Sequence, residues 1–216
     1  MVQQQRAIRT RKVFLKAAAE VFNEHGYDAA TIAAILDRAG LTKGALYFHF
    51  TSKEELARGV LQEAVTTDGV SPQAFKLQEW IDAALLLAYR LPREPLLSAA
   101  IRLSVDPRAR NLFGTRWPDW ITYGAELLTE AKERGELLPH VNPATTSRLL
   151  VGAWTGVQVV RESMPERPLA LVTEISALFE TILPNITQPA VLARLDTSPY
   201  RAERIISHTT TATAAP

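Results

Sequence analysis

The chain contains no cysteine, which excludes disulfide bridges and thiolate metal sites. Its net charge is only +1 over 216 residues, so charge alone gives little reason to expect a nucleic-acid partner. No stretch approaches the roughly 18 to 20 uncharged residues that a membrane span needs, and the N-terminus is polar and basic rather than apolar. We therefore expect a cytoplasmic protein without a membrane partner.

Recognisable catalytic motifs are also missing. The sequence has no phosphate-binding glycine loop, no H-E-x-x-H pair and no paired-carboxylate motif. His140 lies beside a proline and His208 in a polar tail, so neither has the neighbours that acid-base chemistry needs. For His25 and His49 we favour a surface or phosphate-facing role over metal ligation. We expect no enzyme activity, no metal and no cofactor.

What is present is concentrated in residues 31–50, TIAAILDRAGLTKGALYFHF. Thr31 has the side chain to cap one short helix, Gly40 ends it, and Thr42 caps a second helix through its hydroxyl oxygen. The second helix begins with small and basic residues, in the turn that reaches base edges when such a helix enters the major groove. This pattern predicts a helix-turn-helix. A bare helix-Gly-helix pattern fits an ordinary helical hairpin in a core equally well, so the flanking residues decide.

The flanks carry positive charge. Residues 1–16 contain five cations and no acidic residue. Over residues 1–60 there are nine Lys and Arg against six Asp and Glu, whereas residues 61–216 have fifteen against seventeen. Phosphates are the natural partner of the first segment. After it, Ser52 and Glu55 form an S-x-x-E capping box, and Lys53 at this helix N-terminus predicts a phosphate clamp.

The segment from Arg9 to Leu61, including Gly26-Tyr27, TKGALYFHF and S-K-E-E-L, resembles the DNA-binding domain of the TetR family of one-component bacterial repressors. RAIRTRKVFLKAAAEVF, TKGALYFHFTSKEELA and GELLPHV further resemble its γ-butyrolactone receptor subgroup. The residues that we expect to bind DNA are Arg6, Arg9, Thr31, Thr42, Lys43, Gly44, Ala45, Tyr47, His49 and Lys53.

From residue 60 onward, apolar residues recur at helical spacing and prolines mark the helix ends. An all-α fold is therefore expected, with helices near 52–66, 72–90, 95–104, 118–134, 143–163 and 168–183, and an irregular turn at 105–117. We place the DNA-binding domain at 1–51, a ligand-binding and dimerisation domain at 52–206, and a disordered tail at 207–216.

The second domain has aromatic and polar residues among its apolar positions, as helical ligand sites do. Gln158 is notable because an amide inside an apolar helix must be satisfied, either by protein groups or by a ligand. Taken singly, each tryptophan is more easily explained as core. The resemblance favours Trp120, which stands where these receptors carry a pocket tryptophan. The expected ligand-binding residues are Tyr89, Trp120, Thr155 and Gln158.

The resemblance implies a homodimer that binds double-stranded operator DNA and leaves it when a small lactone or butenolide enters the second domain. Genes of antibiotic production are the expected targets. Two alternatives stay open: a pseudo-receptor with a changed ligand, and a multidrug sensor that answers an antibiotic or another apolar metabolite.

Overall fold

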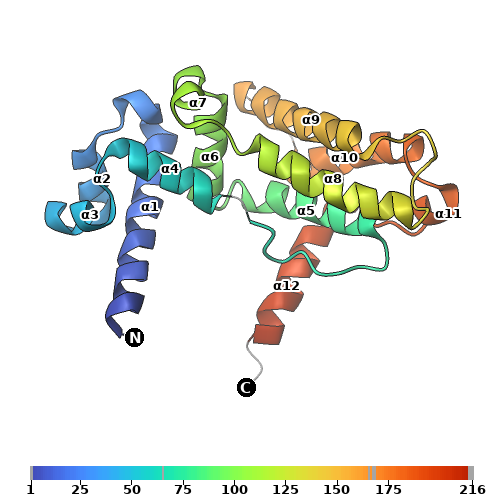
Figure 1. The fold of residues 1–216 in the computed structure, drawn as a ribbon, viewed down its shortest axis with the longest axis horizontal. Helices are drawn as coiled ribbons and strands as arrows, with labels where there is room; N and C mark the ends of the chain where they lie inside the picture. Colours follow the sequence, from blue (N-terminus) through green and yellow to red (C-terminus); the bar gives the residue numbers. More distant parts are fainter. Residues whose placement is uncertain (1, 65, 165, 167–168, 214–216) are drawn as a thin grey trace. The chain divides into compact units, whose positions relative to one another are not determined.

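The computed structural model describes residues 2–64, 66–164, 166 and 169–213, and no β-strand occurs among them. The all-α fold predicted from the sequence is confirmed. By packing, the chain forms two compact units (Figure 1). The first comprises Met1–Thr66 and Leu91–Arg116, and the second Thr67–Arg90 and Trp117–Pro216. A functional boundary after residue 51 stays a proposal, because packing alone joins later helices to the first unit.

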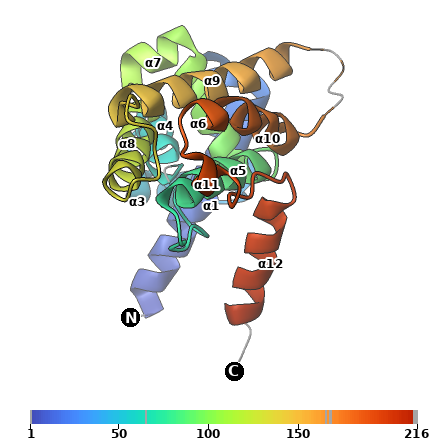
Figure 2. The same cartoon turned by 90° about the vertical axis from the view of Figure 1, so that its right-hand side faces the viewer.

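The first unit is assembled around one long helix. Its elements are α1 (Val2–Ala29), α2 (Ile32–Ala39), α3 (Lys43–His49), α4 (Lys53–Glu63), α6 (Pro95–Val105) and α7 (Pro107–Phe113). Gly26 interrupts α1 with φ 76° and ψ 172°, a conformation that favours glycine and makes the expected turn before the motif. The first turns of α1 extend beyond the other helices of this unit (Figures 1 and 2).

Local hydrogen bonds fix the ends of the two short helices. The Thr31 hydroxyl oxygen accepts from the Ala34 amide at 3.1 Å, and the Thr42 hydroxyl oxygen accepts from the Ala45 amide at 3.2 Å. Gly40 ends α2 in the left-handed conformation, with φ 63°. These contacts confirm the helix-turn-helix that the sequence predicts.

The capping box at the start of α4 forms in a modified way. Ser52 Oγ accepts from the Glu55 amide at 3.2 Å, as predicted. The Glu55 carboxylate accepts from the amide of Thr51 at 2.6 Å, one residue before the cap. This hydrogen bond lowers the pKa of Glu55. The junction between α3 and α4 is thus held from both sides.

Polar contacts attach α6 to α1 within the first unit. Asn23 Nδ2 donates to Ser98 Oγ at 2.7 Å and to the Pro95 carbonyl at 3.0 Å. Arg102 Nη1 donates to the Asn23 carbonyl at 2.7 Å. Because these contacts join residues more than 70 positions apart in sequence, they explain why the unit is discontinuous along the chain.

The second unit contains the remaining helices. They are α5 (Lys76–Arg90), α8 (Trp117–Glu133), α9 (Pro143–Ser163), α10 (Leu171–Ile182), the 3-10 helix η1 (Leu183–Asn185), α11 (Pro189–Leu192) and α12 (Arg201–Thr213). α5 packs against α8, α10 and α12, and α9 packs against α8 and α10. α5 therefore packs against three other helices of this unit.

A buried carboxylate begins α5. Glu136, only 3 % exposed, accepts from the backbone amides of Lys76 and Leu77, both at 3.0 Å. These amides belong to the first turn, where a helix has no internal acceptor and favours negative charge. The GELLPHV segment, which the sequence offers only as a family signature, therefore acts as a helix cap from 60 residues away.

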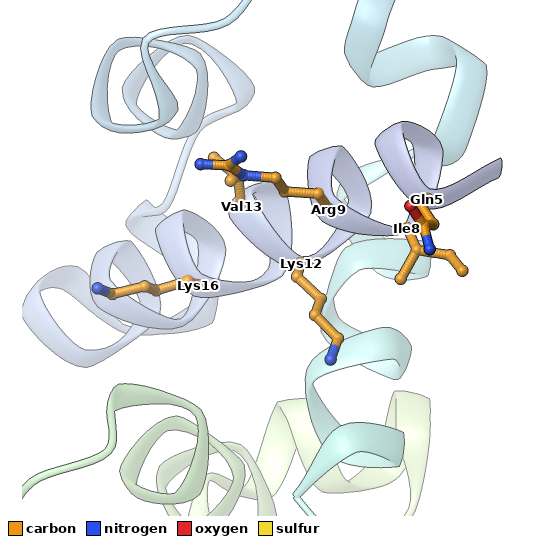
Figure 3. A pocket seen from close by; sticks show the side chains of 6 residues that line it. All are labelled: Gln5, Ile8, Arg9, Lys12, Val13 and Lys16. Carbon is orange, nitrogen blue, oxygen red and sulfur yellow. The ribbon is translucent and has the colours of Figure 1, made fainter. Parts of the chain in front are cut away.

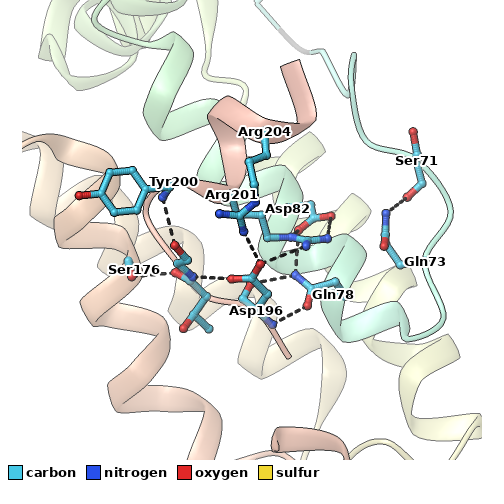
Figure 4. A network of polar contacts seen from close by, with 11 residues as sticks. Ser71, Gln73, Gln78, Asp82, Ser176, Asp196, Tyr200, Arg201 and Arg204 are labelled. Carbon is cyan, nitrogen blue, oxygen red and sulfur yellow. Dashed lines mark hydrogen bonds and ion pairs between the residues drawn. The ribbon is translucent and has the colours of Figure 1, made fainter. Parts of the chain in front are cut away.

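A second polar contact holds α5 one turn further on (Figure 4). Asp82, 1 % exposed, pairs with Arg201 through both carboxylate oxygens, one of them at 2.7 Å from Arg201 Nη2. Gln78 donates to Asp82 at 2.8 Å and accepts from the Asp196 amide at 2.8 Å. Since every polar partner here is buried or paired, the network attaches the start of α12 to α5.

Several expected boundaries differ from the structure. Segment 105–117 is not an irregular turn, because Asp106 caps α7 by accepting from the Ala109 amide at 2.7 Å. The helices near 72–90 and 168–183 begin later, at Lys76 and Leu171. The expected disordered tail at 207–216 coincides in part with α12, which continues to Thr213, and 214–216 lie outside the described residues. A helix satisfies its backbone groups internally, so a low apolar content does not exclude it.

Within the described ranges, no helix is both long and apolar enough to cross a membrane. In the same part of the chain, no group of three or more His, Cys, Asp or Glu side chains is placed to hold a metal ion.

We predict that Gly59→Ala destabilises the first unit. A Cβ at Gly59 would lie 2.7 Å from Leu15 Cδ2 and 3.3 Å from a Phe50 ring carbon, both in the core. Overpacking of this kind costs about 1 to 3 kcal/mol. Gly44→Ala is the matched control, because its Cβ meets nothing within 4 Å. Urea unfolding of both variants measures the difference, and equal stabilities would contradict the prediction.

Candidate nucleic-acid interface and ligand site

The face of α3 that points away from the core carries the predicted base-reading residues. Leu46 is fully buried and anchors this helix, while Lys43, Gly44 and Tyr47 are exposed. The Lys43 ammonium lies 5.8 Å from the centre of the Tyr47 ring. Small and polar groups on an exposed helix face, with the Tyr47 side chain 46 % exposed, are suited to a DNA groove.

Sequence analysis missed the most exposed large apolar residue of this helix. Phe48 is 78 % exposed, and its ring and the His49 ring form a T-shaped pair with centroids 5.0 Å apart. Apolar side chains read the thymine methyl group in the major groove. Phe48 directly follows Tyr47, and both side chains are exposed. Leu46 is the buried residue of α3, and a short helix with so few buried positions must expose its other apolar side chains.

A second surface of the first unit is basic. The exposed side of α1 is lined by Gln5, Ile8, Arg9, Lys12, Val13 and Lys16, which surround a shallow hollow (Figure 3). In the described part of the chain, Arg9, Lys12 and Lys16 have no acidic partner. Arg6, one turn before them in α1, is also exposed. Lys12 and Lys16, which are absent from the predicted set, belong to this surface.

Glu20, Glu24 and Glu63 of the first unit are paired with arginines of the same unit. Arg38 donates to both oxygens of Glu24, at 2.8 and 2.7 Å, and to Glu20 at 3.3 Å. The Arg38 hydrogen bond lowers the pKa of Glu24, so this carboxylate stays ionised and paired. Arg11 pairs in the same way with Glu63, at 2.8 Å. The cations of the α1 surface therefore remain uncompensated.

The other predicted DNA-binding residues divide into two groups. Thr31 and Thr42 are exposed, but their hydroxyl oxygens already cap helices. Ala45 and His49 are half-buried, and the His49 ring packs 6.4 Å from Phe14 of α1. Their contacts with DNA stay predictions.

Lys53 is placed differently from the other cations. Its ammonium donates to the carbonyls of Tyr27, Asp28 and Ala30, at 2.8, 3.3 and 2.9 Å. It also lies 4.4 Å from the centre of the Tyr27 ring. A phosphate contact by Lys53 would have to compete with these partners.

The predicted ligand residues lie on three helices of the second unit. Tyr89 is on α5, Trp120 on α8, and Thr155 and Gln158 on α9. α8 packs against both α5 and α9, and the Trp154 indole donates to the Ala84 carbonyl of α5 at 3.3 Å. The three helices are thus neighbours. Within the described residues, however, Trp120 has no ring contact or hydrogen bond with Thr155 or Gln158.

Trp120 faces a different neighbour. Its ring meets Tyr123 edge-on, with centroids 6.2 Å apart, and both side chains are half-buried. Burial raises the pKa of Tyr123, and the nearby Glu79 and Asp82 raise it further, so its hydroxyl remains a hydrogen-bond donor. A small cavity of about 290 Å³ beside it is lined by Pro118, Asp119, Thr122, Tyr123 and Glu126.

Gln158 is buried and only half satisfied. Its Nε2 donates to Glu162 Oε1 at 2.5 Å, whereas its Oε1 is buried without a partner. The carboxylate fixes the amide orientation, because the reversed amide would place two acceptors together. The unsatisfied group is therefore an acceptor, not the donor that a lactone carbonyl needs. Thr155 is the neighbouring residue whose hydroxyl can donate.

Comparisons with known proteins agree with this geometry. Residues 14–60 match the family described as bacterial regulatory proteins, tetR family. The A-factor receptor protein of Streptomyces griseus is 36 % identical over 196 residues, which cover 90 % of this chain and 70 % of the relative. The chain belongs to the TetR family.

Solved structures of TetR-family proteins have the same fold. Full-length native TylP, a TetR regulator from Streptomyces fradiae, is 40 % identical with a TM-score of 0.86, over 94 % of this chain and 98 % of that one. A γ-butyrolactone receptor (ArpA-like protein) is 25 % identical with a TM-score of 0.75, over 92 % and 98 % of the two chains. Both similarities extend over both units, so they include the second unit as well as the DNA-binding motif.

We predict that Lys43 and Tyr47 of this TetR-family chain support DNA binding in different ways. Lys43→Ala should lose about 1 to 3 kcal/mol of discrimination between operator and other DNA, because the first turn of α3 reaches base edges. Tyr47→Phe should weaken binding evenly across sequences, because we expect its hydroxyl to donate to a phosphate. Titrations with operator and random duplexes separate the two effects, and unchanged affinities in both variants would refute them.

Proposed function

We propose that this protein is a transcriptional repressor that binds operator DNA as a homodimer and leaves it when a γ-butyrolactone or a related butenolide binds the second unit. The observation that carries the DNA-binding part is the exposed face of α3, with Lys43, Gly44 and Tyr47, beside an α1 surface of unpaired cations. The side chains of both features are exposed, and together they fit base edges and phosphates.

The ligand part rests on likeness to relatives. A protein described as an A-factor receptor and another described as a γ-butyrolactone receptor resemble this chain along most of its length. In the proposed pocket, helices α5, α8 and α9 would supply the apolar walls, Thr155 a hydroxyl donor and Gln158 its unpartnered buried oxygen as an acceptor. A ligand with an acyl chain, a carbonyl and a hydroxyl would match this set. Genes of antibiotic production are the proposed targets.

Release from DNA follows from linkage. If a ligand prefers a conformation in which the two recognition helices no longer match the operator, it lowers operator affinity by the same factor by which DNA lowers ligand affinity. No enzymatic step is needed. The test is a gel-shift titration of the operator complex with candidate lactones, butenolides and antibiotics. Release by an antibiotic but by no lactone would favour the multidrug-sensor alternative.

We predict that Trp120→Ala abolishes release by the cognate lactone while operator binding is kept. A tryptophan side chain covers a large apolar area, and Trp120 belongs to the second unit whereas the α3 face belongs to the first. Trp117→Ala is the matched control, because Trp117 is another half-buried tryptophan of α8. Normal induction in Trp120→Ala would move the pocket elsewhere, and loss of DNA binding would mark Trp120 as a core residue.

We further predict that α9 and α10 pair with their copies across a two-fold axis. α9 exposes Leu149 (66 %), Val159 (41 %) and Val160 (57 %), which is an unusual set for a helix facing only water. Val160→Glu should place a charge in this contact and shift the protein toward monomer in sedimentation experiments. Leu112→Glu, at an exposed leucine of α7 in the other unit, is the control. A wild-type protein that sediments as a monomer at micromolar concentration would contradict the proposal.

A further inference from the structure

Lys53 connects the two ends of the DNA-reading motif. It is the first residue of α4, which directly follows α3, and its ammonium reaches the carbonyls of Tyr27, Asp28 and Ala30, which precede α2. An ammonium group has three N–H donors, so these three acceptors use its full capacity. The side chain therefore joins the entrance of α2 to the exit of α3.

Charge and packing hold the ammonium in this position. Two of the carbonyls that it binds, those of Tyr27 and Asp28, lie in the last turn of α1, where unpaired carbonyl groups favour a cation. The Tyr27 ring lies beneath it at 4.4 Å, a distance that adds cation–π attraction. In the described part of the chain, no acidic side chain pairs with Lys53.

The Tyr27 ring is itself fixed from two further sides. The Tyr27 ring packs at a tilt against the Phe22 ring, with centroids 5.9 Å apart. It also forms a T-shaped pair with Phe113 of α7, with centroids 4.9 Å apart. Tyr27 is only 8 % exposed. Because these contacts fix the Tyr27 ring, the ring holds the Lys53 ammonium in one place. Through its hydrogen bonds, Lys53 then fixes the backbone at Tyr27–Ala30.

We propose that Lys53 is a positioning residue, which fixes the orientation of α2 and α3, and that it does not bind a DNA phosphate. This proposal replaces the phosphate clamp that the sequence predicts for Lys53. It rests on the proposed DNA-binding function. The orientation of a recognition helix decides which bases its side chains meet, so a positioning residue governs sequence preference, whereas a phosphate contact governs affinity for all sequences alike.

Salt dependence separates the two roles. Each phosphate neutralised by a cation adds about 0.9 to the slope of log affinity against log salt concentration. The substitutions are Lys53→Met, which removes the charge, and Lys53→Arg, which keeps the charge but cannot reproduce three donors from one atom. Lys12→Ala is the matched control, since Lys12 is an exposed cation of α1 without a partner among the described residues.

The measurement is fluorescence anisotropy with two duplexes over a range of salt concentrations. One duplex carries the operator selected by the wild-type protein from a random pool, and the other a scrambled sequence. Lys53→Met and Lys53→Arg should each reduce operator preference about tenfold, the scale of one misplaced base contact, without changing the salt slope. Lys12→Ala should weaken both duplexes alike and reduce the slope by about 0.9.

Two results would overturn the proposal. A slope reduced by about 0.9 in Lys53→Met, with operator preference kept in both Lys53 variants, would establish a phosphate contact. Unchanged preference and unchanged slope would leave Lys53 with neither role. If Lys53→Met does not fold, the Lys53→Arg result decides alone, because preference kept in that variant contradicts positioning. Failure of the proposed function is distinct, since the wild-type protein would then select no operator.

Discussion

The second unit depends on the way in which a single helix, α5, is held at its first two turns. Glu136 receives its opening amides, and one turn later Asp82 binds Arg201 at the start of α12. Both carboxylates are buried, and a buried charge is tolerated only when its partners are complete. Segments that lie 60 and 119 residues away along the chain are therefore required for α5 to stand where it does. The remaining helices of the unit pack around it.

In the first unit, local hydrogen bonds rather than buried ion pairs hold the recognition helix in place. Its recognition helix has seven residues and only one buried anchor, Leu46, which is too little to hold a helix by apolar packing alone. Stability comes instead from caps at Thr42 and Ser52, and from the ammonium of Lys53 bridging the ends of the motif. Because so few residues of α3 are buried, most of its surface stays available for DNA.

The sequence was informative where structure is local, and less so where it depends on distant partners. The caps at Thr31, Thr42 and Ser52 and the Gly26 turn follow from residue types at short spacing, and the structure has each of them. The role of Glu136 could not be predicted, because a glutamate in a turn gives no sign of the helix that it caps. The contacts of Lys53 were hidden for a related reason: the sequence shows a lysine at a helix N-terminus, but not that its long side chain reaches the carbonyls of Tyr27 and Ala30.

The discontinuity of the first unit has a consequence for how such regulators exchange parts. A recombination event that joined the reading head of one protein to the sensor of another after residue 51 would separate Asn23 from Ser98 and Arg102. In each hybrid, α1 of one protein would then have to pack against α6 of the other without these matched contacts. An exchange that keeps both units whole must carry α6 and α7 with α1 and leave α5 with the second unit, which takes three breakpoints. DNA specificity and ligand specificity should consequently evolve mainly by point substitution inside an inherited frame, and wholesale shuffling of halves should be rare.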